Sequence, residues 1–144
     1  MNKNQHFKLL CVEDSARVLR MLKAIFEKAG YDVATAADGI AGLQKVTENP
    51  EPFDLIVTDL KMPGRGGLGF IEEARAAGYN GAIVVYAATI ARRDRERLWQ
   101  LDVNRIIPKP ARSAELVRAV MEVQKGTLNS RSSGSLLRRV SPKS

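Results

Sequence analysis

The sequence has little of the residue types that redox and zinc sites need. Its 144 residues include one cysteine, Cys11, and one histidine, His6. A single cysteine excludes a disulfide within the chain, and one histidine does not build a zinc site without other ligand types. No apolar run approaches the roughly eighteen residues of a membrane span, and residues 1–4 lack the hydrophobic region of a signal peptide. We therefore expect a cytoplasmic protein with Cys11 as a small buried residue.

Short, continuous apolar runs are present instead, and such runs are typical of strands buried on both faces of a sheet. Polar or turn residues bound the runs, which are Phe7 to Val12, Tyr31 to Thr35, Phe53 to Thr58, Ala82 to Ala87 and Arg105 to Ile107. The second run is shorter and more polar than the others, as an outer strand would be.

Segments with helical spacing separate these runs. Helices are predicted over Ser15 to Ala29, from Asp38 to Asn49, over Gly67 to Ala77, over Ile90 to Gln100, and from an N-cap at Ser113. Strands that alternate with helices favour right-handed crossovers and a parallel sheet covered on both faces. The expected fold is α/β, a five-stranded parallel sheet flanked by five helices, doubly wound and flavodoxin-like.

Charged residues stand at the ends of three of the apolar runs. Glu13 and Asp14 follow the first run, Asp59 follows the third and Lys109 follows the last. Because the carboxyl ends of parallel strands meet at one edge of a sheet, we expect these groups to converge there. Carboxylate oxygens suit magnesium, and Asp59 can supply a nucleophile. The pattern predicts a magnesium-dependent phosphoryl-accepting site, with Pro110 allowing a cis peptide bond after Lys109.

These motifs resemble those of the receiver domain of two-component response regulators. The resemblance extends over about residues 6 to 125, and three motifs match in order and approximate spacing: Glu13-Asp14, the run Asp59 to Gly64, and Lys109-Pro110. It implies a phosphorylation-controlled signalling module that receives its phosphoryl group from a sensor histidine kinase or a phosphotransfer protein.

The resemblance also implies a role for each site residue. Asp59 would accept the phosphoryl group from a phosphohistidine, and Lys109 would contact the phosphoryl oxygens. Asp14 would bind Mg²⁺ directly and Glu13 largely through water, with Asp59 and the backbone carbonyl of Lys61 as further ligands. Haloacid-dehalogenase-like phosphatases need a second Asp two positions after the nucleophile, where this chain has Lys61. We therefore expect a phosphoacceptor with self-catalysed phosphorylation and dephosphorylation only, and not an enzyme.

Two positions depart from the family pattern. Ala87 occupies the position of the switch Thr or Ser and has no hydroxyl, and Ile106 aligns with the aromatic switch residue. Thr89 could replace the missing hydroxyl only if its loop shifted. We therefore expect Asp59 to be phosphorylatable but the response to be atypical. The alternative is a receiver-like scaffold or interaction module whose switching is lost.

Positive charge is concentrated in two segments of a chain with 23 Lys and Arg against 16 Asp and Glu. The predicted fourth helix contains Arg92, Arg93, Arg95 and Arg97, which suit an acidic protein partner or form a solvated face with local ion pairs. Trp99, in the same helix, is expected to pack in the core.

The second basic segment is the end of the chain. We expect a receiver domain over residues 1–125 and a basic, Ser-rich tail over residues 126–144 that is disordered alone. Nucleic-acid binding through this tail would be a weak, salt-sensitive contribution. Nineteen residues do not bury a core, so no output domain of its own is expected; a stand-alone receiver and a fragment of a longer regulator both remain open.

Overall fold

A computed structural model describes residues 7–64 and 66–133. Its centre is a parallel sheet with the strand order β2-β1-β3-β4-β5. The strands are β1 (Lys8–Val12), β2 (Asp32–Ala36), β3 (Leu55–Thr58), β4 (Ala82–Ala87) and β5 (Arg105–Pro108). The order places β1 beside β3 and β4 beside β5, so the predicted site residues follow strands that are neighbours.

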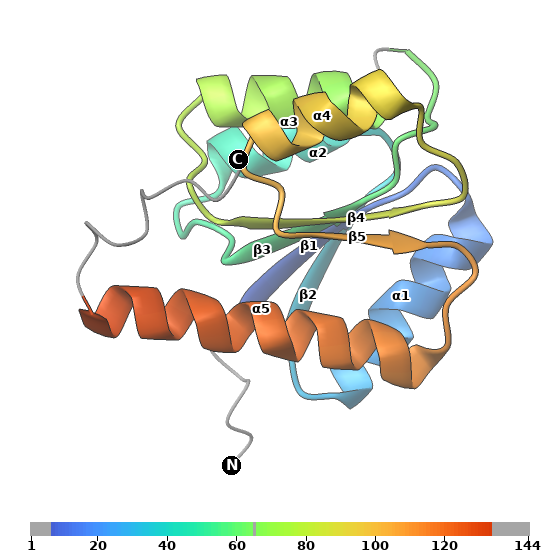
Figure 1. Ribbon diagram of the computed structural model, residues 1–144. Helices are drawn as coiled ribbons and strands as arrows, with labels where there is room; N and C mark the ends of the chain where they lie inside the picture. Colours follow the sequence, from blue (N-terminus) through green and yellow to red (C-terminus); the bar gives the residue numbers. More distant parts are fainter. Residues whose placement is uncertain (1–6, 65, 134–144) are drawn as a thin grey trace.

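Helices cover both faces of the sheet (Figure 1). One face is covered by α1 (Ala16–Lys28) and α5 (Ser113–Ser133), and the other by α2 (Gly39–Glu48), α3 (Gly66–Ala76) and α4 (Arg92–Gln100). This arrangement confirms the expected α/β fold with five parallel strands and five helices. Among the described residues, no helix is long and apolar enough to cross a membrane.

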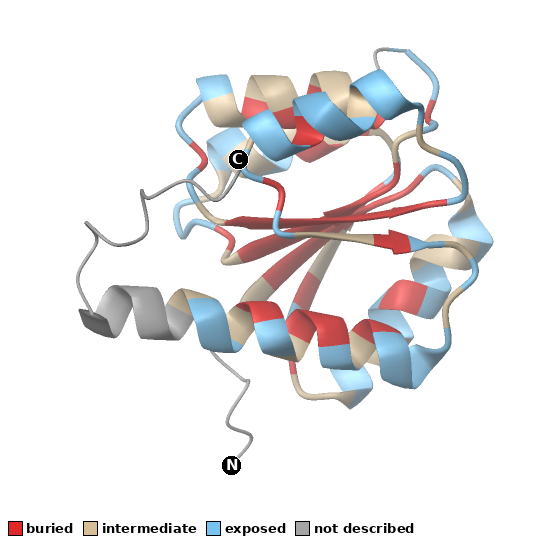
Figure 2. Ribbon diagram, in the orientation of Figure 1, coloured by how far each residue is buried: buried red, intermediate tan, exposed pale blue. Residues whose placement is uncertain are grey.

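The central strands are buried on both faces, as Figure 2 shows, because helices pack above and below them. Alternate residues of each strand enter two apolar clusters, one under α1 and α5 and one under the other three helices. Cys11 belongs to the first cluster with an exposed fraction of 0%, and burial raises the pKa of its thiol to about 12. Its expected role as a small buried residue is confirmed.

Helix starts near the site are capped by side chains. The hydroxyl of Ser15 accepts a hydrogen bond of 3.3 Å from the backbone N–H of Val18, so α1 begins directly after the acidic pair. Asp38 caps α2 in the same way. Ser113 is not the N-cap of α5: it is the first helical residue, and the carbonyl of Arg112 accepts the first bonds from Glu115 and Leu116.

The helix α5 is longer than the sequence indicates. It continues through Gly126 to Ser133, whereas a disordered tail was expected from residue 126. Composition alone marks this segment as polar, but the helix is already formed by turns whose Leu116, Val120 and Val123 are buried, and adding residues to a formed helix is easier than starting one. The rest of the predicted tail, residues 134–144, lies outside the described residues.

The packing of α4 also differs from the expectation. Trp99 is 39% exposed, and Leu98 is the buried residue of this helix. Consecutive residues of a helix point about 100° apart, so the burial of Leu98 turns Trp99 toward the edge of the interface. The prediction that Trp99 packs in the core is wrong.

Candidate phosphoacceptor site

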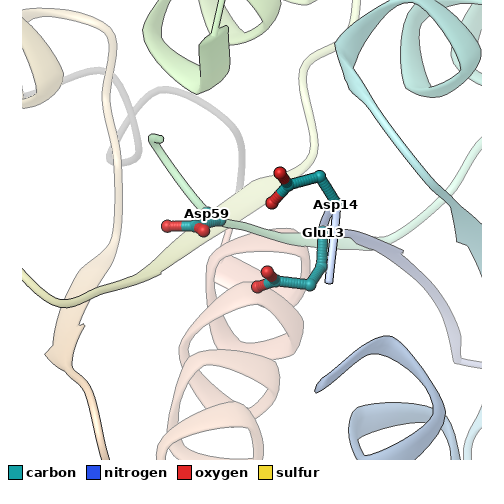
Figure 3. A group of neighbouring side chains, drawn as sticks. All are labelled: Glu13, Asp14 and Asp59. Atoms are coloured by element: carbon teal, nitrogen blue, oxygen red, sulfur yellow. The ribbon is translucent and has the colours of Figure 1, made fainter. Parts of the chain in front are cut away.

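Three carboxylates gather where β1 and β3 end (Figure 3). Val12 pairs with Thr58, and the backbone N–H of Asp59 donates to the carbonyl of Val12 at 3.1 Å. This register brings Glu13 and Asp14 beside Asp59. One carboxylate oxygen from each of the three residues lies within 4.8 Å of the others. The sequence prediction that these carboxylates converge is therefore met in the structure.

The two members of the acidic pair differ in exposure. Glu13 is 2% exposed, whereas Asp14 is exposed to solvent. Oxygen Oε2 of Glu13 accepts a hydrogen bond of 3.2 Å from the backbone N–H of Ser15, and Oε1 accepts one of 3.0 Å from Lys109. Burial raises the pKa of Glu13 above its usual value, and the hydrogen bonds from Lys109 and Ser15 lower it only in part.

Hydrogen bonds to both carboxylate oxygens hold the Asp59 side chain in one orientation. Oδ1 accepts a hydrogen bond of 2.7 Å from the backbone N–H of Leu60, and Oδ2 accepts one of 3.1 Å from Nζ of Lys109. The Asp59 residue is buried, with an exposed fraction of 6%. A carboxylate fixed in this way is preorganised to act as a nucleophile in a defined direction.

Lys109 directly follows β5, the strand at one edge of the sheet, and its side chain reaches two of the carboxylates. Its backbone N–H donates to the carbonyl of Ala87 at 3.0 Å, and its peptide bond to Pro110 is cis, as the sequence allowed. Burial by itself lowers the pKa of the ammonium, but hydrogen bonds to Glu13 and Asp59 and the charges of both carboxylates raise it by more, so the pKa lies above its usual value. Lys109 therefore stays charged at neutral pH.

The two atypical positions, Ala87 and Ile106, lie on β4 and on β5, the strand that precedes this lysine. Ala87 ends β4, is 3% exposed and pairs with Pro108, the residue before Lys109. Its methyl group cannot donate a hydrogen bond. Ile106 is half-buried and packs against the cluster under α2, α3 and α4. Thr89 is exposed in the loop after β4. The assignment of these residues to the switch positions and their roles in switching stay predictions.

The loop after β3 approaches the site closely. Gly67 donates from its backbone N–H to the carbonyl of Leu60 at 2.9 Å, and a Cβ at position 67 would overlap the carbonyl oxygen of Asp59. Only glycine lets α3 begin this close to the end of β3. The side chain of Lys61 in the same loop is exposed, and the use of its carbonyl as a metal ligand stays a prediction.

The sequence analysis missed one residue that contacts the site. The ring centroid of Tyr86 lies 5.4 Å from Nζ of Lys109, and its hydroxyl accepts a hydrogen bond of 3.2 Å from the backbone N–H of Ala111. Strand alternation was the available signal: residue 86 precedes Ala87 at the same strand end and faces the opposite side of the sheet.

The donor set fits a magnesium ion. Hard carboxylate oxygens are the ligands that Mg²⁺ prefers, and three carboxylates this close repel one another unless cations offset their charge. Within the described part of the chain, the single positive charge of Lys109 pairs with two of the three carboxylates, Glu13 and Asp59. The cluster therefore has an excess of negative charge that a divalent cation would neutralise.

Comparison with known proteins agrees with this geometry. The sequence matches the response regulator receiver domain family over residues 9–121. The transcriptional activator protein PfeR of Pseudomonas aeruginosa is 33% identical over 109 residues, which are 76% of this chain and 35% of PfeR. The chain spans about half or less of the length of the first curated relatives that it matches, with shares of 49%, 35% and 50%.

Solved structures show the same fold. A CheY-like response regulator receiver domain protein from Methanospirillum hungatei JF-1 has a TM-score of 0.78 at 24% identity and covers 85% of this chain and 97% of its own. The response regulator protein TrrA from Thermotoga maritima, in complex with Mg²⁺ and BeF, has a TM-score of 0.71 at 26% identity, with shares of 81% and 97%. This chain belongs to the response regulator receiver domain family of two-component signalling.

Proposed function

We propose that Asp59 accepts a phosphoryl group from a phosphohistidine on a sensor histidine kinase or phosphotransfer protein, and that Mg²⁺ supports the transfer. One observation carries the proposal: Asp59, Glu13 and Asp14 bring carboxylate oxygens within 4.8 Å of one another, and Lys109 donates to Asp59 and Glu13. A nucleophile, a cation site and a fixed ammonium are the groups that phosphoryl transfer requires.

The residues divide the reaction between them. An oxygen of Asp59 forms the new bond to phosphorus while the bond from phosphorus to the donor's imidazole nitrogen breaks and its electron pair stays on that nitrogen. The N–H of Leu60 and the ammonium of Lys109 orient the Asp59 carboxylate before the attack. Lys109 is also within reach to balance the charge of the incoming phosphoryl oxygens.

The carboxylates of Glu13, Asp14 and Asp59 would hold the magnesium ion, with the carbonyl of Lys61 as a further ligand. When bound, Mg²⁺ neutralises phosphoryl oxygens and so lets a dianionic group approach an anionic carboxylate. Position 61 has no second acid that could activate water. We therefore propose a phosphoacceptor and not a turnover enzyme. The cytoplasmic location expected from the sequence belongs to the same proposal.

Intact mass spectrometry tests the acceptor. The protein is incubated with acetyl phosphate, with and without Mg²⁺, beside an Asp59→Asn variant. We expect one added phosphoryl group that requires both Mg²⁺ and Asp59. A phosphotransfer protein charged with labelled phosphate serves as a second donor. Absence of labelling from both donors would overturn the proposal.

The surface of α4 supports an additional, finer proposal: that an acidic partner binds there. Arg92, Arg93 and Arg95 are exposed, and within the described part of the chain they form no ion pair. Arg97 instead pairs with Glu72 of α3 at 2.8 Å. Arg92 and Arg95 are three residues apart and therefore lie on one side of α4, where exposed guanidinium groups attract carboxylates.

Binding of a glutamate-rich peptide tests this surface. We expect binding that weakens as salt rises and is lost in an Arg92→Glu/Arg95→Glu variant, because the interaction is between exposed charges. Lys23→Glu/Lys28→Glu on α1 is the matched control, because it changes the net charge by the same four units at two exposed positions. Equal loss in both variants would assign the binding to overall charge and contradict a site on α4.

A second candidate function is an interaction module that does not switch. Buried Ala87 favours it, because no hydroxyl at this position can follow a phosphoryl group. The intact contacts of Lys109 with both carboxylates count against it. Phosphorylation of Asp59 without any change in amide NMR spectra beyond the site would favour this second function.

A further inference from the structure

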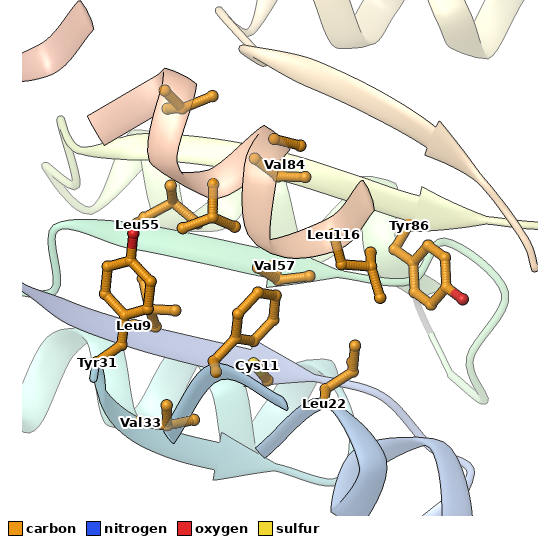
Figure 4. Close-up of a cluster of buried hydrophobic side chains, with 14 of the residues drawn as sticks. Leu9, Cys11, Leu22, Tyr31, Val33, Leu55, Val57, Val84, Tyr86 and Leu116 are labelled. Carbon is orange, nitrogen blue, oxygen red and sulfur yellow. The ribbon is translucent and has the colours of Figure 1, made fainter. Parts of the chain in front are cut away.

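Tyr86 occupies a position between the site and the α1/α5 face of the sheet. It is the penultimate residue of β4 and 3% exposed. Its ring lies in the apolar cluster under α1 and α5, near Leu116 and Leu22 in Figure 4. Ala87, the next residue, belongs to the cluster on the opposite face. The two strand-end residues therefore connect the site to different layers of the molecule.

The ring of Tyr86 contacts the lysine that completes the site. Nζ of Lys109 lies 5.4 Å from the ring centroid, within the range in which an ammonium is attracted to an aromatic face. The same Nζ donates to Glu13 at 3.0 Å and to Asp59 at 3.1 Å. The Lys109 side chain is only 21% exposed, so water competes weakly with these contacts.

The hydroxyl of Tyr86 fixes the segment that carries this lysine. It accepts a hydrogen bond from the backbone N–H of Ala111, which is the first N–H after Lys109 because Pro110 has none. On the other side, the N–H of Lys109 donates to Ala87. Hydrogen bonds to β4 thus hold the backbone on both sides of the cis peptide bond, and α5 starts two residues after Ala111.

We infer that Tyr86 is a positioning residue for Lys109: its ring places the ammonium beside Asp59, and its hydroxyl ties that placement to the start of α5. A leucine at position 86 would fill part of the apolar volume but would leave the ammonium without its aromatic neighbour and Ala111 without its acceptor. The expected effect of Tyr86 on the rate of Asp59 phosphorylation rests on the proposed phosphoacceptor function. Its effect on the position of the Lys109 side chain rests on the structure alone.

Phosphorylation rates of matched variants test the effect on rate. With acetyl phosphate and Mg²⁺, we expect Tyr86→Leu to slow labelling of Asp59 between about 2-fold and 30-fold, the range from an exposed to a desolvated ammonium–ring contact. Tyr86→Phe keeps the ring and should be slowed less. Val84→Ala, two residues earlier in the same cluster, removes apolar packing without touching Lys109 and controls for general destabilisation.

A double-mutant cycle distinguishes positioning from packing. If Tyr86 acts through Lys109, Tyr86→Leu should have less than about a 2-fold further effect in a Lys109→Met background. The same slowing in both backgrounds, or equal slowing by Val84→Ala, would overturn the inference.

The side-chain NMR signals of Lys109 decide the inference without any phosphoryl transfer. In the wild type, we expect the methylene protons near Nζ to be shifted upfield by the Tyr86 ring, and Tyr86→Leu to remove this shift while Tyr86→Phe retains it. Unshifted protons in the wild type would overturn the inference. If these signals behave as expected but neither donor labels the wild type, the proposed function fails and the positioning of Lys109 stands.

Discussion

The site has two halves that follow the family pattern to different extents. The carboxylate half, at the ends of β1 and β3, contains Glu13, Asp14 and Asp59, and the structure brings all three together. The switch half, at the ends of β4 and β5, has Ala87 and Ile106 where a hydroxyl and an aromatic ring are usual. The groups proposed to accept a phosphoryl group and the positions proposed to respond to it are on different strands, so one set can change while the other is retained.

Lys109 directly follows β5, in the switch half, but its side chain contacts the carboxylate half. Removing this side chain should have the largest effect on the rate of Asp59 phosphorylation. We expect Lys109→Met to slow phosphorylation of Asp59 by about 100-fold, because one preorganised charge at the reacting group is lost. Labelling kinetics with acetyl phosphate measure this. Lys23→Met, which removes a lysine paired on the surface of α1, is the control. A Lys109→Met rate within about 3-fold of the wild type would contradict the role of the ammonium.

Magnesium should act on the carboxylate half alone. We expect Mg²⁺ at ten times its dissociation constant to raise the free energy of unfolding by about 1.4 kcal/mol, because the ion binds only the folded cluster. Thermal unfolding with and without Mg²⁺ measures the gain. Asp14→Asn and Asp59→Asn should reduce it.

Ala87→Thr is the comparison variant for this magnesium response. It changes the switch half, so it should retain the rise in the free energy of unfolding with Mg²⁺. If Ala87→Thr lost the magnesium response as fully as Asp14→Asn, the two halves would not be separable and the comparison would fail.

A hydroxyl restored at position 87 should change the conformational response to a phosphoryl group, but it should not change the phosphorylation of Asp59. With beryllium fluoride and Mg²⁺ as a phosphoryl mimic, we expect amide shifts in the wild type to stay near the site and shifts in Ala87→Thr to spread over α4 and β5. Ala87→Val has a similar shape without the hydroxyl, and this control separates hydrogen bonding from the cost of about 1–3 kcal/mol for added volume in a packed site. Wide shifts over α4 and β5 in the wild type would show that Ala87 does not limit the response.

The smallest effect is expected at Thr89. Its side chain is exposed in the loop after β4, so it replaces the missing hydroxyl only if the loop moves. We expect Thr89→Ala to change the phosphorylation rate and the mimic-induced amide shifts by less than about 2-fold, as for other exposed positions away from special contacts. A larger loss would identify Thr89 as the group that takes over from Ala87.

Much of the site was predictable because strand ends are visible in the sequence. Val12 and Thr58 end apolar runs, and parallel strands align their carboxyl ends, so the convergence of Glu13, Asp14 and Asp59 followed from pattern alone. Tyr86 was not predictable in the same way. A tyrosine inside an apolar run is typical of core packing, and only the folded chain brings the ammonium of Lys109 to its ring.

The errors have a common cause. Trp99 was expected in the core, but the packing of Leu98 leaves it 39% exposed. The segment from Gly126 was expected to be disordered because of its composition, but it extends a helix that packed turns had already started. In both cases the packing of neighbouring residues decided the structure, and the residue type or composition of the segment did not.

By itself, the sequence determined the order of strands and helices, the burial of the central strands and the carboxylates that gather at one edge of the sheet, because these follow from periodicity and from charge at strand ends. The tertiary structure alone decided which face of α4 is buried, that Lys109 bonds to both Glu13 and Asp59, and that Tyr86 contacts this lysine. Those features depend on contacts between residues far apart in the chain, and such contacts form only when strands and helices pack at fixed distances.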